Sequence, residues 1–218
     1  MDQIPKETAK ERIIRQAIEL FRRTGFLATT VDQVCAAAGV SKGAFFHHFG
    51  SKEELAEACL SRWCSMLQEM EQEAPFCRHP DPLEKLKGAM EFHIGVFESP
   101  DVIKSCLAGT TVQEVSETHP RLREASNACF TAGRIRFAAL IDGAAAACGK
   151  PVDSSSMAAL WLATMQGALL LYKASNDSMV IRSTLSQVRD YIICQLSASD
   201  ASKHVGEVSS SPDSEDSK

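Results

Sequence analysis

The residues with the clearest chemistry lie between Thr30 and Lys52, where hydroxyl, ammonium and imidazole groups alternate with very small side chains. Such donors bind phosphate oxygens and base edges. Short side chains allow a helix backbone to come close to the floor of a groove. The combination predicts a helix that contacts duplex nucleic acid. The candidate contact residues are Thr30, Ser41, Lys42, Gly43, Ala44, Phe46, His47, His48 and Lys52.

Two short helices joined by a tight turn are expected to position these side chains. Thr30 is a candidate N-cap for the first helix, and Ser41 is a candidate N-cap for the second. Gly39 should end the first helix, because glycine enters the left-handed conformation at little cost. Residues 30–49 are therefore predicted to form a helix-turn-helix motif, and its second helix to be the recognition helix.

A longer helix follows the motif. Ser51 and Glu54 have the S-x-x-E spacing of a capping box, which places Lys52 in the first turn, within reach of a phosphate. The apolar pattern continues to about Glu73. A helix of this length would connect a DNA-binding head to a separate body, and movement at its far end would reposition the head.

The segment from Glu7 to about Leu67 resembles the DNA-binding region of the TetR family of bacterial repressors. Two positions depart from the family pattern: Cys35 stands where Ala is usual, and Phe46 replaces a Tyr whose hydroxyl often contacts a phosphate. The resemblance is carried by the leading helix, Thr29-Thr30, Ala38-Gly39-Val40-Ser41-Lys42-Gly43, the aromatic-His-Phe ending, and Ser51-Lys52-Glu53-Glu54-Leu55.

Composition agrees with a soluble protein that presents one end to DNA. The net charge of the 218 residues is −5, but Met1–Lys52 carries eight Lys or Arg against five Asp or Glu. A weakly basic head on an acidic body suits such a protein. The N-terminus lacks an apolar signal-peptide core, and we identified no apolar run near the roughly 18 residues that span a bilayer. We therefore expect a cytoplasmic location and no membrane partner.

Helical periodicity without a strand pattern predicts an all-α fold. We expect an N-terminal three-helix DNA-binding head over 7–67 and a C-terminal helical ligand-binding and dimerisation bundle over 75–198. Residues 199–218 are acidic and rich in serine, which predicts a disordered tail.

The resemblance implies a small-molecule pocket among the middle helices, with apolar walls and a few polar groups. The alternative for each candidate is ordinary core packing, and the sequence does not name the ligand. The candidates are Met90, His93, Phe97, Gln113, Phe130, Trp161 and Met165.

The resemblance also implies a homodimer through the last two helices. The helix over 154–174 is apolar most of the way round, which indicates burial on more than one side. The alternative is an intramolecular helix pair. The expected dimer residues are Leu160, Ala168, Leu171, Leu185, Val188 and Ile192.

Eight cysteines are scattered along the chain without a CxxC pair or zinc-finger spacing. We expect most of them to be buried and reduced, and we expect neither a metal ion nor another cofactor. Cys106 is a possible redox residue, because Lys104 and a nearby helix start would both lower its pKa. Lys173 is a further candidate neighbour.

The leading function is a DNA-binding repressor that a small-molecule effector releases from a palindromic operator. One alternative is a repressor that senses oxidants or electrophiles through Cys106. A second is an enzyme that modifies small molecules in the same pocket, but no nucleophile, base and orienting group stand at a recognisable spacing, so we expect no enzyme activity. A third is a helical interaction module with a vestigial motif.

Overall fold

The computed structural model describes residues 7–98 and 105–197, and the predicted tail over 199–218 lies outside them. All regular secondary structure in these ranges is helical, which confirms the all-α class. The elements are α1 (Ala9–Thr24), α2 (Val31–Ala38), α3 (Lys42–His48), α4 (Lys52–Glu73), the 3-10 helix η1 (Pro75–Arg78), α5 (Pro82–Glu98), α6 (Leu107–Val115), α7 (Pro120–Cys148), α8 (Ser154–Ser175) and α9 (Met179–Ser197).

The helix boundaries of the predicted motif are confirmed. The Thr30 hydroxyl accepts a hydrogen bond from the Gln33 N–H at 3.2 Å, and the Gln33 side chain accepts one from the Thr30 N–H at 2.8 Å. Gly39 ends α2 with φ of 63°, in the left-handed region. The Ser41 hydroxyl accepts from the Ala44 N–H at 3.1 Å and so begins α3.

The predicted capping box of α4 forms only in part. The Ser51 hydroxyl accepts a hydrogen bond from the Glu54 N–H at 3.1 Å, as expected. The Glu54 carboxylate instead accepts from the N–H of Gly50 at 2.8 Å, one residue earlier than a capping box requires. The carboxylate therefore fixes the short link between α3 and α4.

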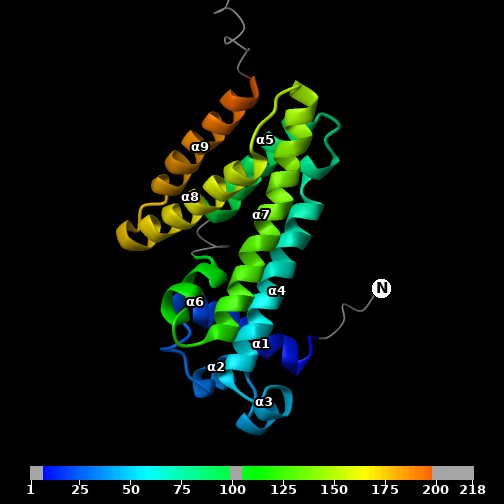
Figure 1. Cartoon of the computed structure of the whole chain (residues 1–218). Helices are drawn as coiled ribbons and strands as arrows, with labels where there is room; N and C mark the ends of the chain where they lie inside the picture. The colour runs from blue at the N-terminus through cyan, green and yellow to red at the C-terminus, as the bar shows by residue number, and fades with distance from the viewer. Residues whose placement is uncertain (1–6, 99–104, 198–218) are drawn as a thin grey trace, which may run out of the picture.

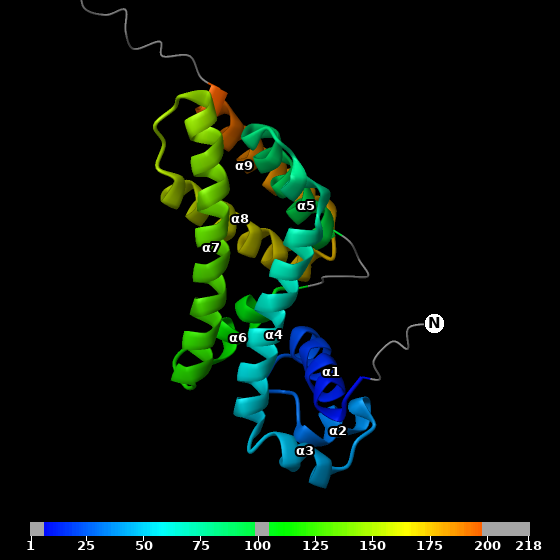
Figure 2. The same ribbon diagram turned by 90° about the vertical axis from the view of Figure 1, so that its right-hand side faces the viewer.

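The head lies at one end of the molecule, and α4 leaves it to run beside α7 into the body (Figure 1). The two helices of the hairpin α8–α9 pack on each other, and α8 also packs against α7. The turned view shows α6 close to the head, between α4 and the start of α7 (Figure 2). The head is therefore connected to the body both through α4 and through α6.

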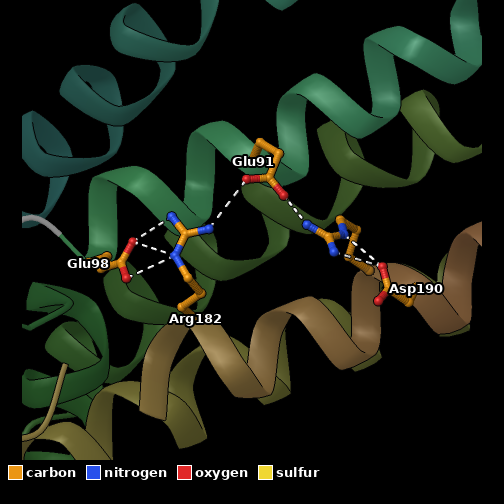
Figure 3. Close-up of polar contacts among 5 residues, drawn as sticks. Glu91, Glu98, Arg182 and Asp190 are labelled. Atoms are coloured by element: carbon orange, nitrogen blue, oxygen red, sulfur yellow. Dashed lines mark hydrogen bonds and ion pairs between the residues drawn. The ribbon is translucent and has the colours of Figure 1, made fainter. Parts of the chain in front are cut away.

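Ion pairs connect α5 to α9 (Figure 3). Arg182 binds the Glu98 carboxylate through two of its nitrogens, at 2.6 and 2.9 Å, and Arg189 pairs with Glu91. Asp190 accepts a hydrogen bond from Arg189 at 2.9 Å. Because several charges form one network, these contacts orient α9 on α5 better than an isolated surface pair would.

One helix within the described ranges, α8, is long and apolar enough to cross a membrane by length and composition. This corrects the expectation that no run approaches that length. The core helix of a soluble protein passes the same test, and α8 packs between α7 and α9. Only 22% of its most apolar window is buried, so this helix exposes apolar side chains.

Candidate functional site

Helix α3 presents most of the predicted DNA contacts on the outer surface of the head. Phe45 is completely buried and anchors the helix, so its neighbours point outward. Phe46 is 55% exposed, so its ring is open to a partner. The exposed members are Ser41, Lys42, Gly43, Phe46 and His47, while Ala44 and His48 are half-buried.

Lys42 lies at the exposed start of this surface. Its ammonium group is 2.7 Å from the Asp32 carboxylate, and both side chains are about two-thirds exposed. The hydrogen bond to Asp32 raises the pKa of Lys42. An exposed pair of this kind adds little stability, so a phosphate can compete with Asp32 for the ammonium group.

Lys52 was expected to reach a phosphate, but its ammonium group is bound inside the head. Its assignment to a phosphate contact is therefore corrected. Its ammonium group donates hydrogen bonds to the carbonyls of Phe26 at 2.8 Å and Thr29 at 2.9 Å. It also lies 4.3 Å from the centre of the Phe26 ring. Lys52 therefore connects the start of α4 to the loop before α2, and its donors are already used inside the head.

The head is joined to the body by Arg22, whose role was not predicted. Its Nε donates a hydrogen bond to the Ser105 carbonyl at 2.9 Å, and the Ser105 hydroxyl donates to the Arg22 carbonyl at 3.0 Å. The guanidinium lies 4.8 Å from the Trp63 ring centre. The side chain is buried, and burial lowers its pKa. The position in α1 carries no sequence signal that separates Arg22 from exposed Arg23.

A second joint involves the loop after α1. The Glu114 carboxylate, on α6, accepts a hydrogen bond from the Leu27 N–H at 3.0 Å. Gly25, with φ of 90°, lies so close that an added Cβ would be 2.0 Å from a Glu114 oxygen. Gly25 is therefore required both by its backbone conformation and by the close approach of α6.

The body contains a cavity of about 80 Å³ between α4, α5, α7 and α8. This volume is room for several water molecules. Five predicted pocket residues line it: His93, Phe97, Phe130, Trp161 and Met165.

Two predicted pocket residues do not line this cavity. Met90 is completely buried in the core and is not part of the cavity wall. Gln113 lies on α6, where its side chain donates to the Gly109 carbonyl at 2.9 Å. It lines a separate pocket of about 260 Å³ that also includes Lys173. Both assignments to the effector pocket are corrected.

Polar groups in the cavity wall form a network that the sequence did not reveal. The Glu71 carboxylate lies 3.0 Å from His93 Nε2 and accepts a hydrogen bond from Arg136 Nε at 2.9 Å. The Trp161 indole N–H donates to His93 Nδ1 at 3.2 Å. An accepting Nδ1 requires the proton of a neutral imidazole to be on Nε2, so His93 donates to Glu71.

These contacts decide the charge of Glu71. Burial raises its pKa, but the hydrogen bonds from His93 and Arg136 outweigh burial and leave the pKa below the ordinary value. Glu71 is therefore a carboxylate whose charge is balanced by Arg136. The rest of the wall is mainly apolar, with the Phe137 and Trp161 rings stacked at 5.2 Å.

The pKa of Cys106 is shifted in the direction opposite to the one expected. Its side chain is buried, and burial raises the pKa of the thiol despite hydrogen bonds that lower it. Lys104, the expected neighbour, lies outside the described residues. The electrostatic argument for a reactive Cys106 is therefore wrong.

The predicted dimer residues divide between the inside and the outside of the subunit. Ala168, Leu185 and Ile192 are buried in the described chain, which corrects their assignment to an intersubunit surface. They point inward because each packs in the core shared with neighbouring helices. Leu160 and Leu171 are exposed and Val188 is half-buried.

Sequence comparisons agree with this architecture. Residues 13–59 match the family described as bacterial regulatory proteins, tetR family, and residues 82–188 match the tetracyclin repressor-like C-terminal domain. The chain is 24% identical over 181 residues to an uncharacterized HTH-type transcriptional regulator in the lacX 3'region of Lactococcus lactis, covering 83% of this chain and 91% of that protein.

Another relative is the uncharacterized HTH-type transcriptional regulator YerO of Bacillus subtilis, 54% identical over 46 residues. That match spans 21% of this chain and only 16% of YerO. A TetR transcriptional regulator from Chloroflexus aurantiacus has a similar structure, with a TM-score of 0.76, 26% identity, and coverage of 86% and 95% of the two chains. The matched families are non-enzymatic regulators, and together they account for most of this sequence. The chain therefore belongs to the TetR family of transcriptional regulators.

Proposed function

We propose that this protein is a cytoplasmic, homodimeric repressor that leaves a palindromic operator when a small molecule enters the cavity in its body. The observation that carries the proposal is the course of α4. This helix begins beside the exposed surface of α3 and reaches the cavity wall at Glu71. A change at the cavity therefore has a direct mechanical route to the head.

The DNA contacts follow from the exposure of α3. In this proposal the bases are approached by Lys42, Gly43, Ala44 and His47, and the phosphate backbone is contacted by Ser41 and His48. Thr30, at the exposed start of α2, is a further backbone contact. A twofold dimer requires half-sites about 34–36 Å apart, one helical turn of the duplex.

The dimer surface that we propose is an apolar stripe on α8. Its members on α8 recur at helical spacing and are all exposed, and the small residues among them would let a partner helix come close. The stripe consists of Leu160, Ala163, Gly167, Leu170 and Leu171, continued on α9 by Val188 and Tyr191. Exposed apolar patches of this kind mark interaction surfaces.

The wall of this cavity suits an effector that is small and mostly apolar, with at most one or two polar groups. Aromatic walls favour stacking, and the one carboxylate is already neutralised by Arg136. To change operator occupancy from nearly full to nearly empty, the effector must prefer the released form by roughly 10⁴-fold.

The test is fluorescence anisotropy with labelled duplexes from the DNA flanking the gene. We expect a dimer to bind one palindromic duplex more tightly than an unrelated duplex of equal length. Binding without sequence preference, or by a monomer alone, would contradict the proposal.

A cavity-filling variant tests the effector site separately. Gly133 lines the cavity, and a Cβ added there meets no atom within 4 Å. Gly133→Leu should therefore retain operator affinity but lose the response to any effector found by screening. Gly143→Leu, an exposed position on the same helix outside the cavity, is the matched control. An unchanged effector response in Gly133→Leu would move the effector site elsewhere.

A further inference from the structure

Two cysteines from different helices meet at the wall of the cavity. Cys64 lies on α4 and Cys129 lies on α7, and the two thiols are close enough that each changes the pKa of the other. Both side chains line the cavity, and both are half-buried rather than enclosed. A molecule that enters the cavity therefore reaches two adjacent thiols.

The surroundings of the pair favour one thiolate. The hydrogen bond from Cys129 and the charge of Arg136 lower the pKa of Cys64 to about 7, although burial and Glu71 oppose this shift. The same interaction raises the pKa of Cys129. The pair thus combines a nucleophilic sulfur with a neighbouring protonated thiol, the arrangement found where an oxidisable cysteine has a resolving partner.

Other cysteines of the chain lack this environment. Burial alone raises the pKa of Cys59. Cys106 also touches the cavity, but its pKa is raised and its side chain is buried. Reaction at the cavity wall should therefore begin at Cys64.

We propose that Cys64 and Cys129 form a dithiol site that a hydroperoxide entering the cavity oxidises to a disulfide. The Cys64 thiolate attacks one peroxide oxygen, so that an S–O bond forms, the O–O bond breaks, and the departing alkoxide takes up a proton as an alcohol. The Cys129 sulfur then attacks the Cys64 sulfenic acid. The S–S bond forms, the S–O bond breaks, and hydroxide leaves with the Cys129 proton as water.

Formation of the disulfide would change the contact between α4 and α7. An S–S bond of about 2.05 Å is shorter than the contact between two unbonded sulfur atoms, so the two side chains and the helices that carry them are drawn together. Because α4 begins directly after α3, we expect the shift to misplace the recognition helix. This consequence for DNA, unlike the oxidation itself, rests on the proposed function.

The oxidation is tested by titrating the reduced full-length protein with cumene hydroperoxide at pH 7. We expect an intact-mass loss of about 2 Da, one linked Cys64–Cys129 peptide pair after digestion, and reversal by dithiothreitol. Cys129→Ser should instead trap a sulfenic acid on Cys64 that dimedone captures. Cys148→Ser, a half-buried cysteine at the end of α7, is the matched control and should behave as the wild type.

Oxidation of a different cysteine pair, or equal mass loss in Cys64→Ser, would overturn the dithiol site. Operator anisotropy decides the coupling independently, with an expected loss of affinity of roughly tenfold on oxidation. If the disulfide forms and affinity is unchanged, the coupling to DNA is wrong. If the reduced protein binds no operator, the proposed function fails while the mass result still decides the dithiol site.

Discussion

The outer surface of the head and the cavity of the body use polar side chains in opposite ways. On α3, Lys42 and His47 extend into solvent, where their donors remain available to a macromolecular partner. In the cavity wall, the polar groups of Glu71, His93 and Arg136 are bound to one another. Substitutions on the head surface should therefore change binding with little effect on folding, whereas substitutions in the interior should change folding as well.

The same distinction separates two lysines that the sequence places ten residues apart. Lys42 is exposed and forms one weak surface pair, whereas Lys52 donates to backbone carbonyls and stacks on Phe26. The free energy of unfolding is a common scale on which to compare such residues. The expected loss of that free energy is largest for Arg22 and smallest for Lys42.

Arg22→Ala should have the largest effect and lower the free energy of unfolding by about 3 kcal/mol, because it removes a buried, charged donor and its packing on Trp63. Chemical denaturation followed by circular dichroism measures this loss. Arg23→Ala, exposed on the same helix, should change stability by less than about 0.5 kcal/mol. Equal effects of the two substitutions would show that the joint between Arg22 and Ser105 is not a major contributor to stability.

Glu71→Gln should cost about 2 kcal/mol at pH 7, because Arg136 loses its countercharge in a part-buried site. The pKa of Glu71 is lower in the folded chain than its ordinary value of 4.5. Its stabilisation is therefore present above pH 4.5 and is lost as pH falls through the lowered pKa. The variant should show a flatter dependence of unfolding free energy on pH below 4.5.

The control for this pH dependence is Glu69→Gln. Glu69 is exposed on the same helix and pairs with exposed Arg62. The Glu69→Gln substitution should leave the fall in unfolding free energy below pH 4.5 close to that of the wild type. If the unfolding free energy of Glu71→Gln still falls steeply below pH 4.5, other carboxylates are responsible for the acid sensitivity.

Lys52→Ala should lower the free energy of unfolding by about 1–2 kcal/mol, because hydrogen bonds from a charged donor to the Phe26 and Thr29 carbonyls are lost. Denaturant unfolding gives the value. In the Lys52→Ala variant, the salt dependence of operator binding should remain close to that of the wild type. The reason is that the Lys52 ammonium group of the wild type is not free to bind a phosphate. A clearly shallower salt slope would restore Lys52 to the phosphate contacts.

Lys42→Ala should change the free energy of unfolding least, by under about 0.5 kcal/mol. Its effect should instead appear in DNA binding, as weaker operator affinity and a reduction of about one in the slope of log K against log salt. Anisotropy titrations at several salt concentrations measure the slope. Asp32→Ala is the control, because it releases Lys42 from its surface pair without removing the cation.

Much of the helical framework could be predicted from short stretches of sequence. The caps at Thr30 and Ser41 and the left-handed Gly39 depend on residues within one or two turns, so the local pattern identifies them. The helix-turn-helix and its exposed recognition surface follow from the same local signals. The pocket in the body was expected from the family resemblance rather than from a local pattern, and five of its seven candidate residues line the cavity.

The tertiary structure decided which of these groups are free and which are already used. Lys52 meets carbonyls 23 and 26 residues away, Arg136 meets a carboxylate 65 residues away, and Arg22 meets a carbonyl 83 residues away. The inward orientation of Leu185 and Ile192 likewise depends on helices distant in sequence. Periodicity specifies a helix and its apolar face, but burial and hydrogen bonding depend on which distant segment packs against that face.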